Sequence, residues 1–80
     1  MTEAQILAGI REVARDHLGW EGPVDVGMSL VEDLGLDSLK TLTLAVEVEN
    51  LFRVRLDPER DLEIVTVGDL VEAVRRELGS

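Results

Sequence analysis

The chain has 80 residues, enough for one small domain, with 17 acidic against 8 basic residues and a formal net charge of −9. This charge excludes nucleic acids and anionic membrane surfaces as natural partners and favours basic patches on other proteins. Without cysteine it has no disulfide or thiolate metal site, and without a ~20-residue apolar run or a signal-peptide pattern we expect a cytoplasmic protein that does not span a membrane.

A first helix is predicted over residues 2–18, because its apolar residues recur at helical spacing. Thr2 is the expected N-cap and Gly19 the residue that ends the helix. The apolar face consists of Ile6, Leu7, Ile10, Val13, Ala14 and Leu18.

Residues 19–36 form a long connection. Ser29 and Glu32 have capping-box spacing, which predicts a short helical turn over 30–34. Apolar and polar residues alternate over 24–30, as in a strand, but we expect no partner strand in a helical chain. We therefore interpret this stretch as a loop that packs over the helix ends.

A second helix is predicted over 38–52, with Asp37 as its N-cap, and a short third helix over 58–63, where Pro58 suits the first turn. This third helix is the shortest and most charged element, so we expect it to be the least stable.

A last helix is predicted over 67–78. Thr66 is its expected N-cap, with Asp69 three residues later, and Gly79 is its expected stop. The four elements predict an all-α fold, a small four-helix bundle that occupies residues 1–80 as a single domain.

The second helix carries two apolar faces when residues are placed about 100° apart. The larger face suits the core and contains Leu44, Ala45, Val48, Leu51 and Phe52. The smaller face begins beside Ser38 and contains Leu39, Leu42 and Val46. Three interpretations of the smaller face remain open: additional core, an exposed patch for another protein, or the lining of a pocket for an apolar cargo.

Ser38 follows a glycine turn and an aspartate at the start of the second helix. A serine nucleophile needs a base and an orienting acid. The only histidine, His17, lies within the apolar face of the first helix, where a packed or edge position is the expected role, and no Gly-x-Ser-x-Gly motif is present. A phosphodiester on the Ser38 oxygen would instead benefit from the free amides and dipole of a helix N-terminus. On the Asp-Ser pair alone, however, a simple helix cap is the favoured interpretation.

Acidic residues alternate at Asp57, Glu59, Asp61 and Glu63. A calcium loop would require glycine at the sixth position and glutamate at the twelfth, where this chain has Leu62 and Gly68. We interpret the run as a solvated acidic surface and expect no metal site.

A longer motif surrounds Ser38. The stretch from Leu30 to Leu39 reads LVEDLGLDSL and resembles the signature of acyl carrier proteins. Further matches follow without a gap at Glu49, at Phe52 and in the later segment IVTVGDL. The resemblance extends from about Leu30 to Leu78, which is most of the chain.

The resemblance implies a four-helix bundle with a long first loop and a short third helix. It also implies that a phosphopantetheinyl transferase attaches 4′-phosphopantetheine from coenzyme A to Ser38, and that the arm's thiol carries acyl groups as thioesters. The chain would then be a monomeric, non-catalytic carrier.

The same resemblance implies that acyl-loading and synthase enzymes with basic patches dock at the second helix. The implied partner-binding residues are Asp37, Leu39, Leu42, Val46 and Glu49.

Two positions depart from the family pattern. Carriers of fatty-acid synthases typically have acids where this chain has Lys40 and Thr43. This departure favours polyketide or other specialised metabolism over housekeeping fatty-acid synthesis, while Leu36-Asp37 favours an acyl over a peptidyl carrier. A different class of function, an unmodified helical interaction domain, stays open as an alternative.

Overall fold

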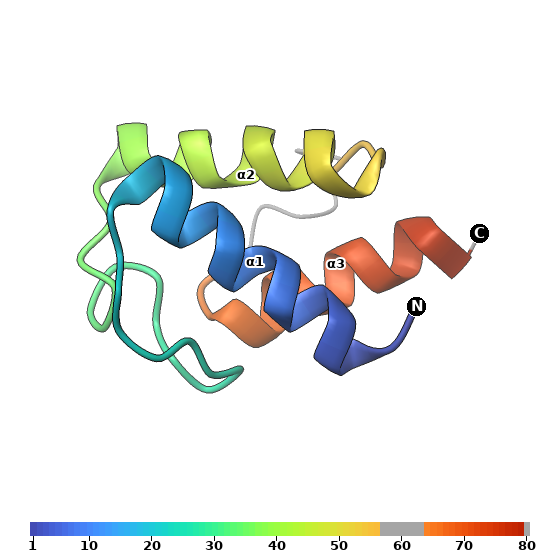
Figure 1. Ribbon diagram of the computed structural model, residues 1–80, viewed down its shortest axis with the longest axis horizontal. Coiled ribbons are helices and arrows are strands. Elements are labelled where there is room, and N and C mark those ends of the chain that lie inside the picture. Colours follow the sequence, from blue (N-terminus) through green and yellow to red (C-terminus); the bar gives the residue numbers. More distant parts are fainter. Residues whose placement is uncertain (57–63, 80) are drawn as a thin grey trace.

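The structure is a computed structural model that describes residues 1–56 and 64–79. Within these residues it contains three helices: α1 (Glu3–Leu18), α2 (Ser38–Phe52) and α3 (Val67–Gly79). Both α2 and α3 pack with α1, and the long connection folds back beside the end where α2 begins (Figure 1). The predicted bounds of the first two helices are confirmed, with Thr2 acting as N-cap of α1.

Both ends of α1 are capped by the residues that the sequence predicts. The Thr2 hydroxyl accepts a hydrogen bond from the Gln5 amide at 3.2 Å, and the Gln5 side chain accepts one from the Thr2 amide at 2.8 Å. Gly19 has a φ of 70° and donates its amide to the Ala14 carbonyl. This left-handed conformation ends the helix at low cost only for glycine or a few polar residues.

The core is aliphatic and draws on every described element. No polar or charged side chain among the described residues is buried. The buried cluster consists of Ile6, Ile10, Val13, Val24, Leu30, Leu34, Leu36, Leu44, Val48, Val67, Leu70, Val71 and Val74. Four of these come from the connection between α1 and α2, so packing in the core fixes the path of that loop.

The connection pairs with the segment that precedes α3. Ser29 and Thr66 form an isolated antiparallel bridge. The Leu30 amide donates to the Val65 carbonyl at 3.0 Å, and the Val67 amide donates to the Met28 carbonyl at 2.9 Å. The expectation that this stretch has no partner was therefore wrong, although its interpretation as a loop over the helix ends is confirmed.

The predicted turn over 30–34 is present, with a modified cap. The Ser29 hydroxyl accepts a hydrogen bond from the Glu32 amide at 3.1 Å, as the spacing predicts. The reciprocal bond comes from Asp33, whose carboxylate accepts from the Ser29 amide at 2.6 Å. The Ser29 carbonyl accepts from the amides of Asp33 and Leu34 at 3.0 and 3.1 Å, which closes a single helical turn.

The last helix begins as predicted. The Thr66 hydroxyl accepts from the Asp69 amide at 3.1 Å, and one Asp69 carboxylate oxygen accepts from the amides of Val65 and Thr66, both at 3.0 Å. These backbone bonds, Val65 first, lower the pKa of the Asp69 carboxyl. The helix ends at Gly79, one residue beyond the predicted Leu78, so Gly79 is its last residue rather than a stop outside it.

The predicted third helix over 58–63 and the acidic run from Asp57 to Glu63 lie outside the described residues. The structure therefore confirms an all-helical fold, and the count of four helices stays a prediction. None of the helices in residues 1–56 and 64–79 has both the length and the apolar composition needed to cross a bilayer.

Candidate functional site

Ser38 is the first residue of α2 and its side chain is exposed. Asp37 precedes it as N-cap, with extended backbone, and its carboxylate accepts a hydrogen bond from the Lys40 amide at 2.8 Å. The Asp37 carbonyl accepts from the Thr41 amide at 2.9 Å, which is the first bond of the helix. The cap is therefore Asp37, and in the described part of the chain the Ser38 hydroxyl makes no hydrogen bond.

Buried residues on both sides of Gly35 fix the turn before Ser38. Leu34 and Leu36 are buried, whereas Gly35 between them is exposed and has a φ of 67°. The Leu36 amide donates to the Leu30 carbonyl at 3.0 Å. Because two leucines are anchored in the core around a left-handed glycine, the chain emerges at Asp37 and presents Ser38 to solvent.

The electrostatic setting of Ser38 suits an anion. The first turn of α2 contains no acidic residue. The amides at the start of the helix and the helix dipole favour a negative group at this end. A phosphodiester on the exposed Ser38 hydroxyl therefore fits the site without displacing an existing side-chain contact.

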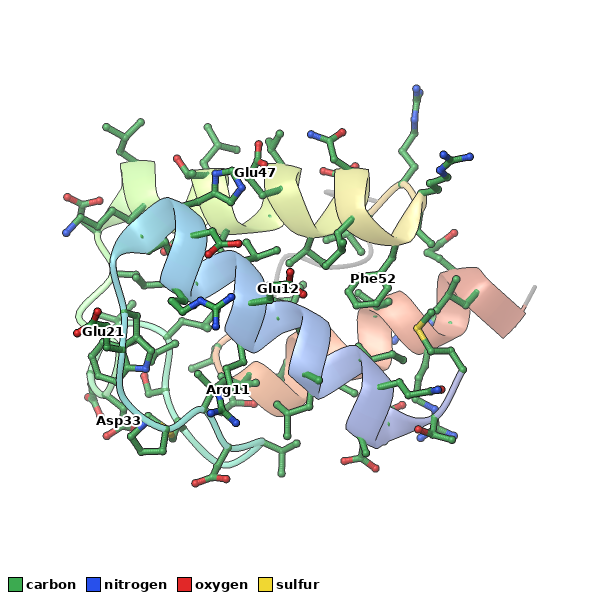
Figure 2. The ribbon with its side chains drawn as sticks, in the orientation of Figure 1. Arg11, Glu12, Glu21, Asp33, Glu47 and Phe52 are labelled. Atoms are coloured by element: carbon green, nitrogen blue, oxygen red, sulfur yellow. The ribbon has the colours of Figure 1, made fainter. Side chains whose placement is uncertain are left out.

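The only histidine of the chain contacts an acid of α2 and makes no hydrogen bond to Ser38. His17 is exposed on α1, and its Nε2 lies 3.0 Å from Glu47 Oε2 on α2. Figure 2 shows Glu47 on the side of α2 that faces α1. The expected edge position of His17 is confirmed, and its contact joins two helices.

The smaller apolar face of α2, from here on the α2 stripe (Leu39, Leu42 and Val46), is exposed. The exposed fractions of these residues are 71%, 61% and 43%. The larger apolar face supplies the buried residues Leu44 and Val48. Exposure of the stripe excludes the interpretation that it is additional core.

Both acids of α2 are engaged with other elements. Glu47 contacts His17 as described, and Glu49 Oε2 accepts a hydrogen bond from the Leu56 amide at 3.2 Å. The Glu49 carbonyl also accepts from the amides of Arg53 and Val54 after the helix. The structure thus places Glu49 at the turn that ends α2, a role that the sequence analysis did not find.

The two departures from the family pattern lie in the first half of α2. Lys40 is exposed in the first turn of α2. Thr43 is half-buried, and its hydroxyl donates to the Leu39 carbonyl at 3.0 Å, a bond within the helix. Neither residue adds a negative charge near Ser38.

The comparison with protein families now bears on this site. The family model described as "Phosphopantetheine attachment site" matches residues 8–74, which include all three described helices in whole or in part. The chain belongs to the acyl carrier protein family.

Similar sequences agree with this assignment. An acyl carrier protein of Exiguobacterium sibiricum is 30% identical over 79 residues, covering 98% of this chain and 100% of that protein. An acyl carrier protein of Sinorhizobium fredii is 34% identical over 74 residues, covering 91% and 95%. The meromycolate extension acyl carrier protein of Mycobacterium leprae is 35% identical over 78 residues, covering 95% of this chain and 67% of that protein.

A solved structure gives the same result for the fold. The Mycobacterium tuberculosis protein Rv0033, described as an acyl carrier protein, superposes with a TM-score of 0.72 at 35% identity and covers 92% of this chain and 95% of its own. The family membership means that this chain carries acyl groups on a covalently attached 4′-phosphopantetheine. Acyl carrier proteins are carriers and not catalysts, which fits the expectation of a non-catalytic chain.

Proposed function

We propose that Ser38 is the residue that bears the phosphopantetheine arm. The observation that carries this proposal is the exposed, unbonded Ser38 hydroxyl at the start of α2, inside the matched region. Ser29, also inside the matched region, is half-buried and uses its hydroxyl to cap the turn over 30–34. Ser80 lies outside the matched region.

The arm supplies the thiol on which acyl groups are held as thioesters. The chain's own residues would position the arm. Asp37 caps the first turn of α2, and Gly35 with the buried leucines on either side of it fixes the turn that leads to Ser38. The N-terminal end of the helix would favour the negative charge of the phosphodiester. The chain has no cysteine, so the arm's thiol is the only one that holo-protein would contain.

We propose that partner enzymes dock on the α2 stripe beside Ser38. A contiguous set of exposed Leu and Val side chains at the modified end of a helix is typical of an interaction surface. The partners would be a phosphopantetheinyl transferase, acyl-loading enzymes and synthases, with basic patches that the net charge of −9 attracts. Asp37 and Glu49 would flank this surface.

For the pathway, we propose polyketide or other specialised acyl metabolism. Lys40 and Thr43, in place of acids, support it, as does the similarity to a meromycolate extension carrier. Housekeeping fatty-acid synthesis and a peptidyl carrier are the alternatives. The proposal includes a single four-helix domain, 1–80, that works as a cytoplasmic monomer.

The test measures the thiol that the phosphopantetheine arm would add to the protein. Purified protein is incubated with coenzyme A and a broad-specificity phosphopantetheinyl transferase, then freed of small molecules and titrated with a chromogenic thiol reagent. We expect a rise from zero to one thiol per chain, because the chain itself has no cysteine.

The Ser38→Ala variant is the control and should remain at zero. A wild-type chain that gains no thiol would contradict the proposal that Ser38 bears the arm. An equal gain in Ser38→Ala would place the arm on another residue.

A further inference from the structure

The outward side of α2 is unusually poor in available negative charge. The chain carries 17 acids, yet α2 has only Glu47 and Glu49. The first of these lies against His17 and the second accepts from the Leu56 amide. Each contact engages one carboxylate oxygen within the fold, which reduces the negative charge that α2 offers to a docking protein.

Lys40 contributes a positive charge to α2. It is exposed in the first turn of α2, two residues after Ser38, and it is the only lysine of the chain. No ion pair of Lys40 is found among residues 1–56 and 64–79. An enzyme that acts at Ser38 must approach this first turn, and the Lys40 ammonium group would then need a hydrogen-bonding counter-charge.

Negative charge is concentrated on the other side of Ser38. Glu32, Asp33 and Asp37 are all exposed in the turn that leads to α2. Ser38 therefore stands between an acidic loop and a helix start that carries the first residue of the α2 stripe and the positive charge of Lys40. The net negative charge can attract basic proteins at long range, while Lys40 favours a negatively charged group at short range.

We propose that this surface selects a partner enzyme of mixed charge: basic groups opposite the acidic loop, an apolar patch opposite the α2 stripe, and a carboxylate opposite Lys40. The proposal rests on the proposed function, because it specifies what docks beside the Ser38 arm. In consequence, an enzyme whose contact with α2 is basic throughout is disfavoured by Lys40.

The experiment measures kcat/KM for arm transfer at low salt with a phosphopantetheinyl transferase whose docking groove is basic. The substrates are wild type, Lys40→Glu and Arg11→Glu. Both variants change the net charge from −9 to −11. Arg11 is the matched control because it extends from α1 away from α2 (Figure 2).

We expect Lys40→Glu to raise kcat/KM about two- to five-fold over wild type, the range of a single exposed charge pair. Arg11→Glu should have a clearly smaller effect, since it alters only the long-range field. Equal effects of the two variants, or none from Lys40→Glu, would overturn the proposal.

A charge exchange tests the carboxylate directly. Basic residues of the transferase groove are replaced by glutamate one at a time, and each transferase variant is assayed with wild type and Lys40→Glu. The original transferase should have the higher kcat/KM with Lys40→Glu. At least one glutamate variant should instead have the higher kcat/KM with wild type, which a double-mutant cycle would show as coupling between the two positions. If no groove variant reverses the order, Lys40 has no carboxylate preference. Failure of the proposed function itself would look different: wild type would not be modified by any enzyme, or Ser38→Ala would be modified equally well.

Discussion

His17 of α1 and Glu47 of α2 meet across the two helices, with Nε2 and Oε2 3.0 Å apart. The contact draws one of the two α2 carboxylates toward the bundle and away from the α2 stripe. It also gives the only histidine of the chain a structural partner. The same contact therefore bears on helix packing and on the charge that a docking enzyme meets.

The pair should contribute little to stability. His17→Ala and Glu47→Ala should show a coupling energy of about 0.2–1 kcal/mol in a double-mutant cycle measured by urea unfolding, because both side chains are partly exposed. A cycle of His17→Ala with Glu12→Ala, on the same helix, is the control and should show no coupling. Equal coupling in both cycles would mean that the contact is not specific.

Leu42→Asp should impair docking without unfolding the protein. Leu42 is largely exposed on α2, so the change should lower the free energy of unfolding by at most about 1 kcal/mol, mainly through helix propensity. Transfer of the arm to Ser38 should fall markedly, measured by the same kcat/KM assay. Leu78→Asp, an exposed leucine of α3, is the matched control and should be modified normally. Loss of the helical circular dichroism signal in Leu42→Asp would contradict the surface assignment.

Gly35→Ala should destabilise the turn before Ser38. The backbone φ is 67° and an added methyl group would meet no neighbouring atom, so the cost is conformational, about 1–2 kcal/mol by urea unfolding. Gly27→Ala provides the comparison, since that glycine also has open space but no positive φ, and it should be neutral or slightly stabilising. Equal results for the two variants would show that the left-handed turn is not required.

Asp69 should make stability depend on acid pH. Its pKa is lowered from the ordinary 3.8 by hydrogen bonds from the Val65 and Thr66 amides, so the ionised form is favoured in the folded state. This contribution is fully present above pH 3.8 and is lost as the pH falls through the lower folded pKa.

Asp69→Asn keeps an acceptor oxygen but removes the charge. The variant should be less stable than wild type by about 0.3–1 kcal/mol at pH 7, and the difference should shrink in acid. Glu72→Gln, an exposed α3 acid outside the cap, is the charge-matched control. A stability difference that does not change with pH would contradict the assignment.

Local signals were enough to predict α1 and α2. Thr2 and Asp37 are caps that each accept from the amide three residues later, and Gly19 ends α1 by its own backbone conformation. The existence of a second apolar face on α2 was also predicted, whereas its exposure was one of three open interpretations that the structure decided. These features depend on residue spacing within one element, which the sequence displays directly.

Contacts between distant segments could not be predicted in the same way. Ser29 and Thr66 pair although they are far apart in the sequence, so no local residue pattern predicts their contact. The hydrogen bonds of this bridge involve backbone atoms and require no particular side chain. The partners of Glu47 and Glu49 likewise come from α1 and from the segment after α2. An acidic residue on a helix thus looked available for docking until its partner was known.

The most direct test of Ser38 as the attachment residue is the mass of the intact protein after incubation with coenzyme A and a phosphopantetheinyl transferase. Wild type and Ser29→Ala should each gain one phosphopantetheine, while Ser38→Ala should gain none and keep its helical circular dichroism signal. A gain in Ser38→Ala equal to that of wild type, or no gain in wild type, would contradict the assignment of Ser38.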